Sequence, residues 1–473
     1  MFSAPRFPLL LALFLAGCPN EPSPTPGAAN GAGTAPKPAS SALAASPSAS
    51  ASATPDEPSP LCEKIAQKTW GTGANRVTGL STKRLADDRI AIGFAFGNTP
   101  HVLVIKPSGE GELIKVAPAP GTALAKPVPA AEGTRTILRV TPYKVEGSSA
   151  KAYVDYRDEF KDKRKHIACG PADGGDEWIS FDGVPLLDRD PKPTGEDRLA
   201  LFKKSTEEGA DEGYHELRDC RTFIDIKKNE TYIIGSELRA LDAGEDKTTY
   251  KSSLVVDTGP KKHEIHLREV DLKGDPPKDV PFDMPTTHGV KDGSYLLAVR
   301  SGGSLLAAFL KPDKSLQSKF VSYAGLPSRP EASRDDEGMT MMVASVNLGQ
   351  SSELRGVRIG PKDELPKSMV KIETGDEDAS SAVDPMFVRD AKNRRWLAYV
   401  AGPRGKGRLK LVGIDENFKP IGKPHPITKE AEGASEPRLV PLDDGRVLVT
   451  YIRESAGAAG ELVSEVLRCD DPR

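Results

Sequence analysis

The sequence lacks the features from which an activity is most often inferred. It has no Gly-x-Ser-x-Gly elbow, so a serine hydrolase of that fold type has no support. Its 65 Lys and Arg residues nearly balance 68 Asp and Glu residues, and this balance does not favour nucleic acid as a partner. None of its five cysteines lies at the short spacing of zinc ligands. We therefore expect no catalytic residue, no metal and no cofactor.

Long apolar runs are also missing. The run from Leu9 to Ala16 is far shorter than the roughly 20 residues that a membrane-spanning helix needs. It follows Arg6 and precedes small residues, a pattern that is typical of a secretory signal peptide. The sequence therefore predicts a signal peptide over residues 1–17 and no other segment that crosses a membrane.

The end of this segment, Leu15-Ala16-Gly17-Cys18, resembles the lipobox of bacterial lipoproteins. The resemblance implies that Cys18 becomes the first residue of the mature chain and carries the lipid. It also implies a bacterial cell-envelope location, with the chain anchored to a membrane by lipid and its domain outside the cytoplasm. An ordinary signal peptide with a chance cysteine is the alternative.

Residues 18–60 are dominated by Pro, Ala, Ser, Gly and Thr, and Leu43 is their only large aliphatic residue. Such a segment buries too little apolar surface to offset the entropy lost on ordering. We predict a disordered tether, which as a flexible coil spans roughly 35–40 Å. The domain is expected over residues 61–473, where no second linker of this composition occurs.

Two-armed segments recur through that domain. In Leu439–Ile452, two apolar arms flank Asp444-Gly445, which suit a type I′ hairpin turn. Other copies turn at Asp87-Asp88, Asp292-Gly293 and Asp335–Gly338. Three copies place a proline ahead of the first arm, at intervals of about 50 residues: Pro330, Pro385 and Pro437.

Two further strand-like runs follow each hairpin, and four strands per period of about 50 residues indicate an all-β chain folded as a β-propeller. Each hairpin is then the inner half of a blade. The length of the domain predicts seven blades, with eight as the alternative, because the region Glu196–Leu272 is hard to divide. Strand-like runs at Arg198–Phe202 and Thr231–Ser236 are too close together there for full blades. Tandem β-sandwiches are the main competing architecture.

Four cysteines remain after Cys18, and they allow three disulfide pairings in an oxidising compartment. A ring-shaped propeller must bring its two ends together. We therefore expect a disulfide between Cys62 and Cys469, which leaves Cys169 to pair with Cys220.

Several weak motifs favour structural interpretations. His263, Glu264 and His266 lie in a strand-like run without metalloprotease spacing, and we expect an exposed edge strand. The acidic stretches 188–197 and 374–385 lack the spacing of a calcium loop and are expected to be solvated turns. A sialidase Asp box is approached by Ser333, Asp335, Gly338 and Thr340, but one residue too many follows Asp335 and no Trp completes it. No sialidase chemistry is carried over.

The remaining interpretation is a monomeric, membrane-tethered module that binds or scaffolds a protein, peptide or glycan. An envelope hydrolase or lyase that acts on polysaccharide is the alternative. Polar turns near Asp292, Asp336 and Asp444 should gather on one rim of the ring. Residues that precede the first arms should gather on the other rim, near the mouth of the central channel, where we expect the ligand: Ser328, Ser381 and Ser435.

Overall fold

The computed structural model describes most of one compact unit within Pro58–Arg473. The described residues are 62–70, 76–97, 99–116, 133–160, 165–171, 179–183, 215–225, 230–242, 248–258, 262–272, 282–289, 293–301, 303–327, 330–334, 339–349, 351–360, 364–376, 381–402, 406–429, 432–454 and 460–470. The expected signal peptide, Cys18 with its expected lipid, the expected tether, Ser328 and the run Arg198–Phe202 lie outside them. Within the described residues, no helix is long and apolar enough to cross a membrane.

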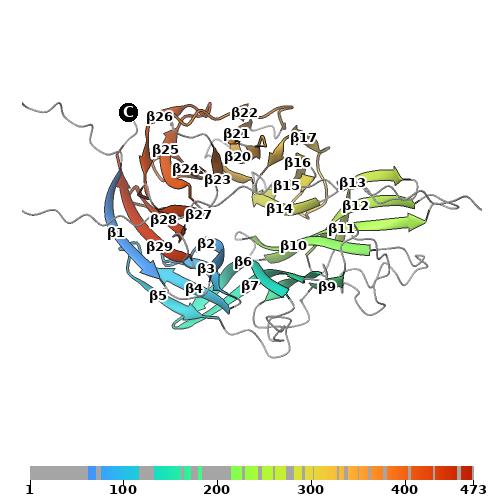
Figure 1. The fold of residues 1–473 in the computed structure, drawn as a ribbon, viewed down its shortest axis with the longest axis horizontal. Coiled ribbons are helices and arrows are strands. Elements are labelled where there is room, and N and C mark those ends of the chain that lie inside the picture. The colour runs from blue at the N-terminus through green and yellow to red at the C-terminus, as the bar shows by residue number, and fades with distance from the viewer. Residues whose placement is uncertain are drawn as a thin grey trace, which may run out of the picture. The chain divides into compact units, whose positions relative to one another are not determined.

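The strands form seven sheets, or blades, that follow one another around a ring in Figure 1. Blade 1 contains β2 (Val77–Arg84), β3 (Ile90–Phe96), β4 (Thr99–Ile105) and β5 (Gly111–Lys115). Blade 2 contains β6 (Gly133–Glu146), β7 (Ser149–Phe160), β8 (Lys165–Pro171) and β9 (Ile179–Gly183). Blade 3 contains β10 (His215–Asp225), β11 (Glu230–Asp242), β12 (Thr248–Asp257) and β13 (Lys262–Leu272). Blade 4 contains β14 (Phe282–Gly289), β15 (Tyr295–Ser301), β16 (Ser304–Leu310) and β17 (Val321–Ala324).

Blade 5 has an interrupted inner strand. It contains β18 (Leu326–Pro327), β19 (Glu331–Arg334), β20 (Thr340–Asn347), β21 (Ser352–Ile359) and β22 (Val370–Lys371). Blade 6 contains β23 (Ala382–Arg389), β24 (Arg395–Ala401), β25 (Arg408–Ile414) and β26 (Pro420–Pro426). Blade 7 contains β27 (Gly433–Pro441), β28 (Arg446–Glu454), β29 (Glu461–Cys469) and, on its outer edge, β1 (Cys62–Trp70).

This topology confirms the predicted seven-bladed propeller in place of eight blades or tandem sandwiches. The described part of the region Glu196–Leu272 is one blade, because β10 to β13 pair in order as a single sheet. The first strand of the unit completes the last blade, where β1 pairs with β29. This pairing closes the ring.

The hairpin Leu439–Ile452 is the inner half of blade 7, as the sequence predicts. Its second arm is buried from Val447 to Ile452 because a neighbouring blade covers each face. The predicted type I′ turn is wrong. Gly445 has a positive φ of 82° and Asp444 does not, whereas a type I′ turn needs positive φ at both central residues. Asp-Gly also suits the turn that forms here, in which the N–H of Gly445 donates to the carbonyl of Leu442 at 3.1 Å.

The inner strands share a bulge. The pairing register slips between Thr78 and Ser81 in β2, and at corresponding places in β6, β10, β14, β23 and β27. Asp384 and Glu436 adopt positive φ in their bulges, and a proline follows each of them. A bulge tolerates proline because it releases the chain from one ladder hydrogen bond. Pro385 and Pro437 therefore lie inside the inner strands rather than ahead of them.

Among the described residues, apolar clusters fill the seams 7/1, 1/2, 3/4, 4/5, 5/6 and 6/7. Gly93 shows how closely two blades approach. A Cβ at this position would lie 2.0 Å from the carbonyl oxygen of Val140 in blade 2. Both predicted disulfides are present and confirm the expected pairing, Cys62–Cys469 within blade 7 and Cys169–Cys220 between blades 2 and 3.

Candidate functional site

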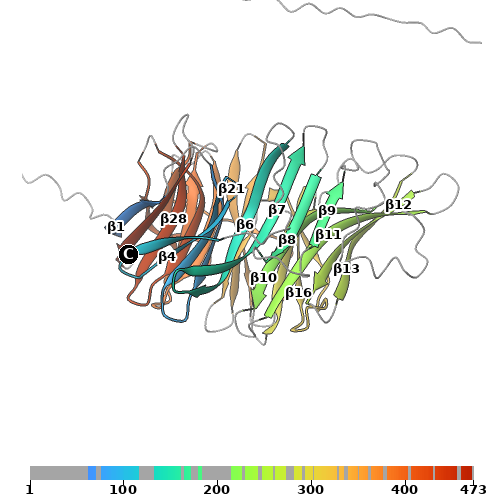
Figure 2. The ribbon, with the colours of Figure 1, turned by 90° about the horizontal axis from the view of Figure 1, so that it is seen from below.

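The strands run between two rims of the ring (Figure 2). We call one of them the turn rim, because it carries the tight turns after the first and third strands of the blades. Their hydrogen-bonded residues include Leu85–Arg89, Lys106–Glu110, Lys311–Ser315, Asp390–Arg394, Asp415–Lys419 and Leu442–Arg446. Each of these turns has one residue with positive φ in its fourth position: Asp88, Gly109, Lys314, Asn393, Phe418 and Gly445. The turn rim is therefore built from copies of one short turn.

We call the opposite rim the link rim, because every connection between consecutive blades leaves and enters there. These connections differ widely in length. The shortest joins β17 to β18, and the longest run from residue 116 to 132 and from 184 to 214. Segments that vary in length on a rigid scaffold are the usual carriers of recognition in such folds. The link rim is therefore the better candidate for a binding surface.

The sequence predictions about the rims can be placed on this frame. Asp444 lies in the turn rim, as expected, whereas Asp292 and Asp336 lie outside the described residues. Ser381 and Ser435 both stand where inner strands begin, at the link rim. They are not equivalent, because the bulge aligns Ser435 with Val383 rather than with Ser381. The Ser435 hydroxyl donates to Glu454 Oε1 at 2.6 Å, and the Ser381 carbonyl accepts from the Gly402 N–H at 2.7 Å.

Polar side chains on the inner strands connect one blade to the next. Arg438 of blade 7 donates from Nε and Nη2 to the carbonyl of Leu80 in blade 1, at 3.0 and 2.7 Å. Glu436 accepts from the N–H of the same Leu80 at 2.9 Å. The hydroxyl of Ser81 donates in turn to the carbonyl of Val140 in blade 2. These charged and hydroxyl groups are engaged in holding the ring together.

The seam between blades 2 and 3 continues this pattern with a buried ion pair. Arg139 Nε donates to Asp155 Oδ2 at 3.0 Å, and both side chains are almost fully buried. Arg139 also donates to the carbonyl of Thr222 in blade 3, while the N–H of Thr222 donates to Asp155 Oδ1 at 2.8 Å. Burial lowers the pKa of the Arg139 guanidinium, and the charge of Asp155 opposes this effect. The pair therefore binds both main-chain groups of one residue across the seam.

A tyrosine, a carboxylate and a lysine meet in two neighbouring seams. Tyr399 and Tyr451 occupy the same position when counted from the left-handed turn residues of blades 6 and 7. Tyr399 donates to Asp376 Oδ2 at 3.3 Å, and Lys410 Nζ lies 2.6 Å from the same oxygen. Burial raises the pKa of the Tyr399 phenol well above its ordinary value. A phenol held neutral in this way is suited to donate a hydrogen bond and poorly suited to act as a base.

The second cluster has the same chemistry but takes its members from other parts of the chain. Tyr451 donates to Glu465 Oε1 at 2.9 Å, and Lys64 Nζ lies 3.0 Å from Glu465 Oε2. Gln67 Nε2 also donates to Glu465 Oε1, at 2.8 Å. Burial raises the pKa of the Tyr451 phenol as well. The two clusters therefore fix blades 5 and 6, and β1 within blade 7, by charge-assisted hydrogen bonds.

Asp376 corrects one sequence prediction. It belongs to the acidic stretch 374–385 that we expected to be a solvated turn, yet its side chain is only 6% exposed. The ammonium group of Lys410 neutralises its charge inside the seam. The part of the stretch between Asp376 and Ser381 lies outside the described residues.

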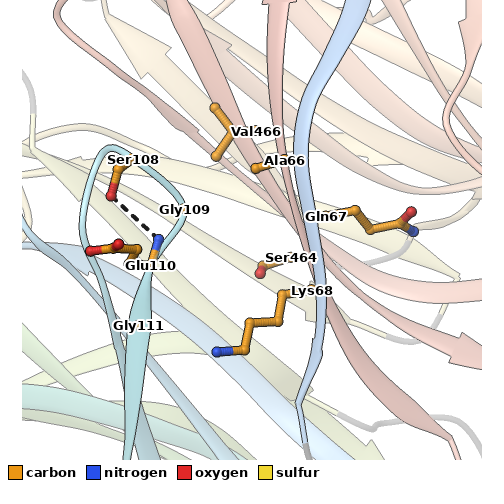
Figure 3. Close-up of a pocket in the computed structure, with 9 residues that line it drawn as sticks. All are labelled: Ala66, Gln67, Lys68, Ser108, Gly109, Glu110, Gly111, Ser464 and Val466. Carbon is orange, nitrogen blue, oxygen red and sulfur yellow. Dashed lines mark hydrogen bonds between the residues drawn. The ribbon is translucent and has the colours of Figure 1, made fainter.

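A pocket of about 310 Å³ opens between blade 7 and the β4–β5 turn of blade 1 (Figure 3). It is lined by Ala66, Gln67, Lys68, Ser108, Gly109, Glu110, Gly111, Ser464 and Val466. Its polar groups are partly engaged, because Trp70 Nε1 donates to Ser464 Oγ at 2.7 Å and the Lys68 ammonium lies 4.0 Å from the Trp70 ring centroid. The volume is near the lower end of the roughly 300–1,000 Å³ of small-molecule sites. The link rim remains the stronger candidate.

The predicted edge position of His263, Glu264 and His266 agrees with the topology, because all three lie on β13, the outer strand of blade 3. The described residues contain no group of three His, Cys, Asp or Glu side chains that is close enough to hold a metal ion.

Sequence reasoning missed the residues that hold the seams. Arg438, Asp155, Asp376 and Glu465 carry no motif. The first three acquire their roles where two blades meet, and Glu465 acquires its role where β1 joins blade 7. One signal was present for the two tyrosine clusters. Aligning the repeats on their turns places Tyr399 and Tyr451 in register, and a polar aromatic residue repeated in a buried strand calls for a hydrogen-bond partner.

Comparison with known proteins gives no family and only distant structural likenesses. No protein-family profile and no curated protein sequence matches this chain. A structure of a protein of unknown function from Dyadobacter fermentans DSM 18053 is 12% identical, with 87% of this chain and 100% of that chain covered and a TM-score of 0.40. The NanB sialidase from Streptococcus pneumoniae is 9% identical, covering 80% and 83%, with a TM-score of 0.40. The Dos1 propeller is 8% identical, covering 85% and 94%, with a TM-score of 0.43. At these identities and TM-scores the likenesses carry no argument about a ligand or a reaction.

Proposed function

We propose that this protein is a lipid-anchored binding module of the bacterial cell envelope, and that its partner docks on the link rim. One observation carries the proposal. The two rims divide the ring into a face of repeated short turns and a face that receives all the connections between blades. A protein, peptide or glycan is the expected partner, and neither nucleic acid nor a second copy of the chain is required.

The point where the chain enters the ring supports this orientation. Cys62 is paired with Cys469, whose carbonyl accepts a hydrogen bond from Arg394 in a turn-rim turn. The described chain therefore begins at the turn rim, which supports a proposal that leaves the link rim for a partner. A tether of residues 18–60 holds such a domain away from the membrane that anchors it.

The polar groups of the seams favour binding over catalysis. Glu436, Asp155, Asp376 and Glu465 each accept hydrogen bonds that hold blades or strands together. A hydrolase or lyase acting on polysaccharide needs carboxyl groups that face the substrate and exchange protons with it. Residues whose removal would loosen the ring are poor candidates for that role.

The anchor is tested by Cys18→Ser. The variant should leave the membrane fraction or remain as an unprocessed precursor, because the hydroxyl group cannot take the lipid. Cys62→Ser is the matched control, since it also removes one thiol but leaves the lipobox intact, and it should remain in the membrane fraction. A Cys18→Ser protein of mature size in the membrane fraction would contradict the anchor.

The binding face is tested by photo-crosslinking in native membranes. A benzophenone amino acid replaces Lys429 or Leu348, which are exposed on the link rim, and Lys392, which is exposed on the turn rim, serves as the matched control. The link-rim positions should give a discrete adduct and Lys392 none. An adduct from Lys392 alone would overturn the assignment. Turnover of an envelope polysaccharide by the purified protein would favour the hydrolase or lyase.

A further inference from the structure

The place where the tether meets the propeller is mechanically exposed. Cys62 is the first residue of β1, which is the outermost strand of blade 7 and pairs with β29 alone. The low-complexity segment 18–60 precedes it directly. Any pull on an anchored tether therefore reaches the ring first at the end of an edge strand.

An edge strand is a weak point for such a pull. In an antiparallel pair the hydrogen bonds run perpendicular to the strands, so a force on the first residue opens one residue pair at a time. Each pair contributes little net free energy, and the pairs would break in sequence rather than together. Peeling β1 in this way would open the ring, because β1 is the strand that closes it.

The disulfide lies at the residue pair that would open first. Cys62 faces Cys469 in the register of β1 and β29, and the two sulfurs are bonded. β29 is hydrogen-bonded along both of its edges, to β28 on one side and to β1 on the other. A pull on Cys62 therefore passes through a covalent bond to a strand that is paired along both edges.

The far side of the disulfide is secured to the next blade. Arg394 of blade 6 donates from Nη1 to the Cys469 carbonyl at 2.8 Å and from Nη2 to the Gly445 carbonyl at 2.8 Å. Its Nε donates to Asp390 Oδ2 at 2.6 Å, and the same oxygen accepts from Trp396 Nε1 at 3.0 Å. The Asp390 side chain is fully buried and that of Arg394 is 9% exposed. The end of blade 7 is thus tied to the core of blade 6.

We propose that the Cys62–Cys469 disulfide and Arg394 form a force path that carries tension from the tether past β1 into blades 7 and 6. The inference rests on the proposed membrane anchor for its biological role, although the force path itself does not depend on lipid. Cys62 is 3% exposed and Cys469 5%. A buried disulfide resists thiol exchange, so this bond acts as a permanent staple rather than a redox switch.

Single-molecule force spectroscopy on the full-length chain tests the proposal. Handles are attached through p-azidophenylalanine at Leu61, just before β1, and at Leu316, which is 38% exposed in blade 4. The native protein should show no early extension before the ring unfolds. The Cys62→Ala/Cys469→Ala variant should first extend by about 50 Å at a lower force, as roughly 15 residues at about 3.5 Å each leave the ring.

Two matched controls separate this effect from a general loss of stability. The Cys169→Ala/Cys220→Ala variant removes the other disulfide and should show no early step of that length. Arg394→Lys should lower the force of the first event, whereas Arg446→Lys, at the equivalent turn position of blade 7, should leave it unchanged. Within the described residues, the Arg446 side chain pairs with the exposed Asp444 of its own blade.

The outcomes are decisive in each case. An unchanged first event in the Cys62→Ala/Cys469→Ala variant would overturn the proposal, and so would the same early step in the Cys169→Ala/Cys220→Ala control. Failure of the anchor is seen separately. If Cys18→Ser remains in the membrane fraction at mature size, the force path has no membrane anchor to act against. The force measurements on the ring would still hold.

Discussion

Among the described residues, different kinds of contact stand out in blade 7 and in the seam between blades 2 and 3. Blade 7 packs apolar side chains on both of its faces, and its disulfide joins two strands of one sheet. The described contacts at the 2/3 seam instead include a disulfide between blades, the buried Arg139–Asp155 pair and the two bonds to Thr222.

The two regions should therefore lose stability in different ways when residues are substituted. Apolar packing contributes in proportion to the area buried and loses a little with each atom removed. A buried ion pair is tolerated only while both partners are present, because removing one partner leaves an uncompensated buried charge. The 2/3 seam should therefore be the more brittle of the two, while blade 7 should depend most on its covalent closure.

The largest effect is expected from loss of the ring-closing disulfide. In the chain-entropy model the 407-residue separation of Cys62 and Cys469 is worth about 6 kcal/mol, and the 51-residue separation of Cys169 and Cys220 about 4 kcal/mol. Urea unfolding of the two double-alanine variants should show the larger loss for Cys62→Ala/Cys469→Ala. The opposite order would mean that the 2/3 seam, rather than the closure, limits the stability of the ring.

The second largest loss of stability is expected from breaking the buried Arg139–Asp155 ion pair. Asp155→Asn should cost about 3–5 kcal/mol of unfolding free energy, because Arg139 keeps its charge and loses its partner. The double variant Arg139→Met/Asp155→Asn should recover much of this loss, as measured in the same unfolding experiment. A single variant that is as stable as the native protein would show that the 2/3 seam is not brittle.

A smaller effect is expected at the closest approach of two blades. Gly93→Ala places a Cβ against the main chain of Val140, and forcing the blades apart should cost about 1–3 kcal/mol. Gly360→Ala is the control, because an added Cβ there meets nothing within 4 Å. Equal thermal midpoints for Gly93→Ala and Gly360→Ala would contradict the packing described for the 1/2 seam.

The smallest effect concerns the tyrosine clusters. Tyr451→Phe removes a donor from a fully buried carboxylate and should cost about 1–2 kcal/mol. Tyr399→Phe should cost less, because its bond to Asp376 is longer at 3.3 Å. Chemical denaturation of both variants gives the comparison. A larger loss of unfolding free energy for Tyr399→Phe would reverse the ranking of the two tyrosine clusters.

The architecture was predictable because the same local sequence pattern repeats along the chain. The hairpin that contains Asp444 and Gly445 recurs with the period of a blade, and a ring needs its ends joined, which led to the correct pairing of Cys62 with Cys469. The turn type was not predictable, since Asp-Gly suits more than one turn and the choice depends on the twist of the flanking strands.

The seam residues could not be predicted from the sequence. Asp376 lies in a stretch that resembles an exposed acidic loop, and only the arrangement of blades 5 and 6 brings Lys410 to it. Ser381 and Ser435 both precede a proline-containing arm, but Ser381 lies four residues before its proline and Ser435 two residues before its own. The two strands carry matching bulges, so Ser435 aligns with Val383. Long-range contacts of this kind follow from ring closure and leave no local pattern.

The most direct test of the central claim is hydrogen exchange on the protein in its native membranes, compared with the same protein after purification. A binding module whose partner sits on the link rim should show slower exchange in the membranes for residues 372–376, 427–429 and 348–349. The turn-rim segments 390–394 and 442–445 should exchange equally in both samples. Protection confined to the turn rim, or none on either rim, would contradict the account.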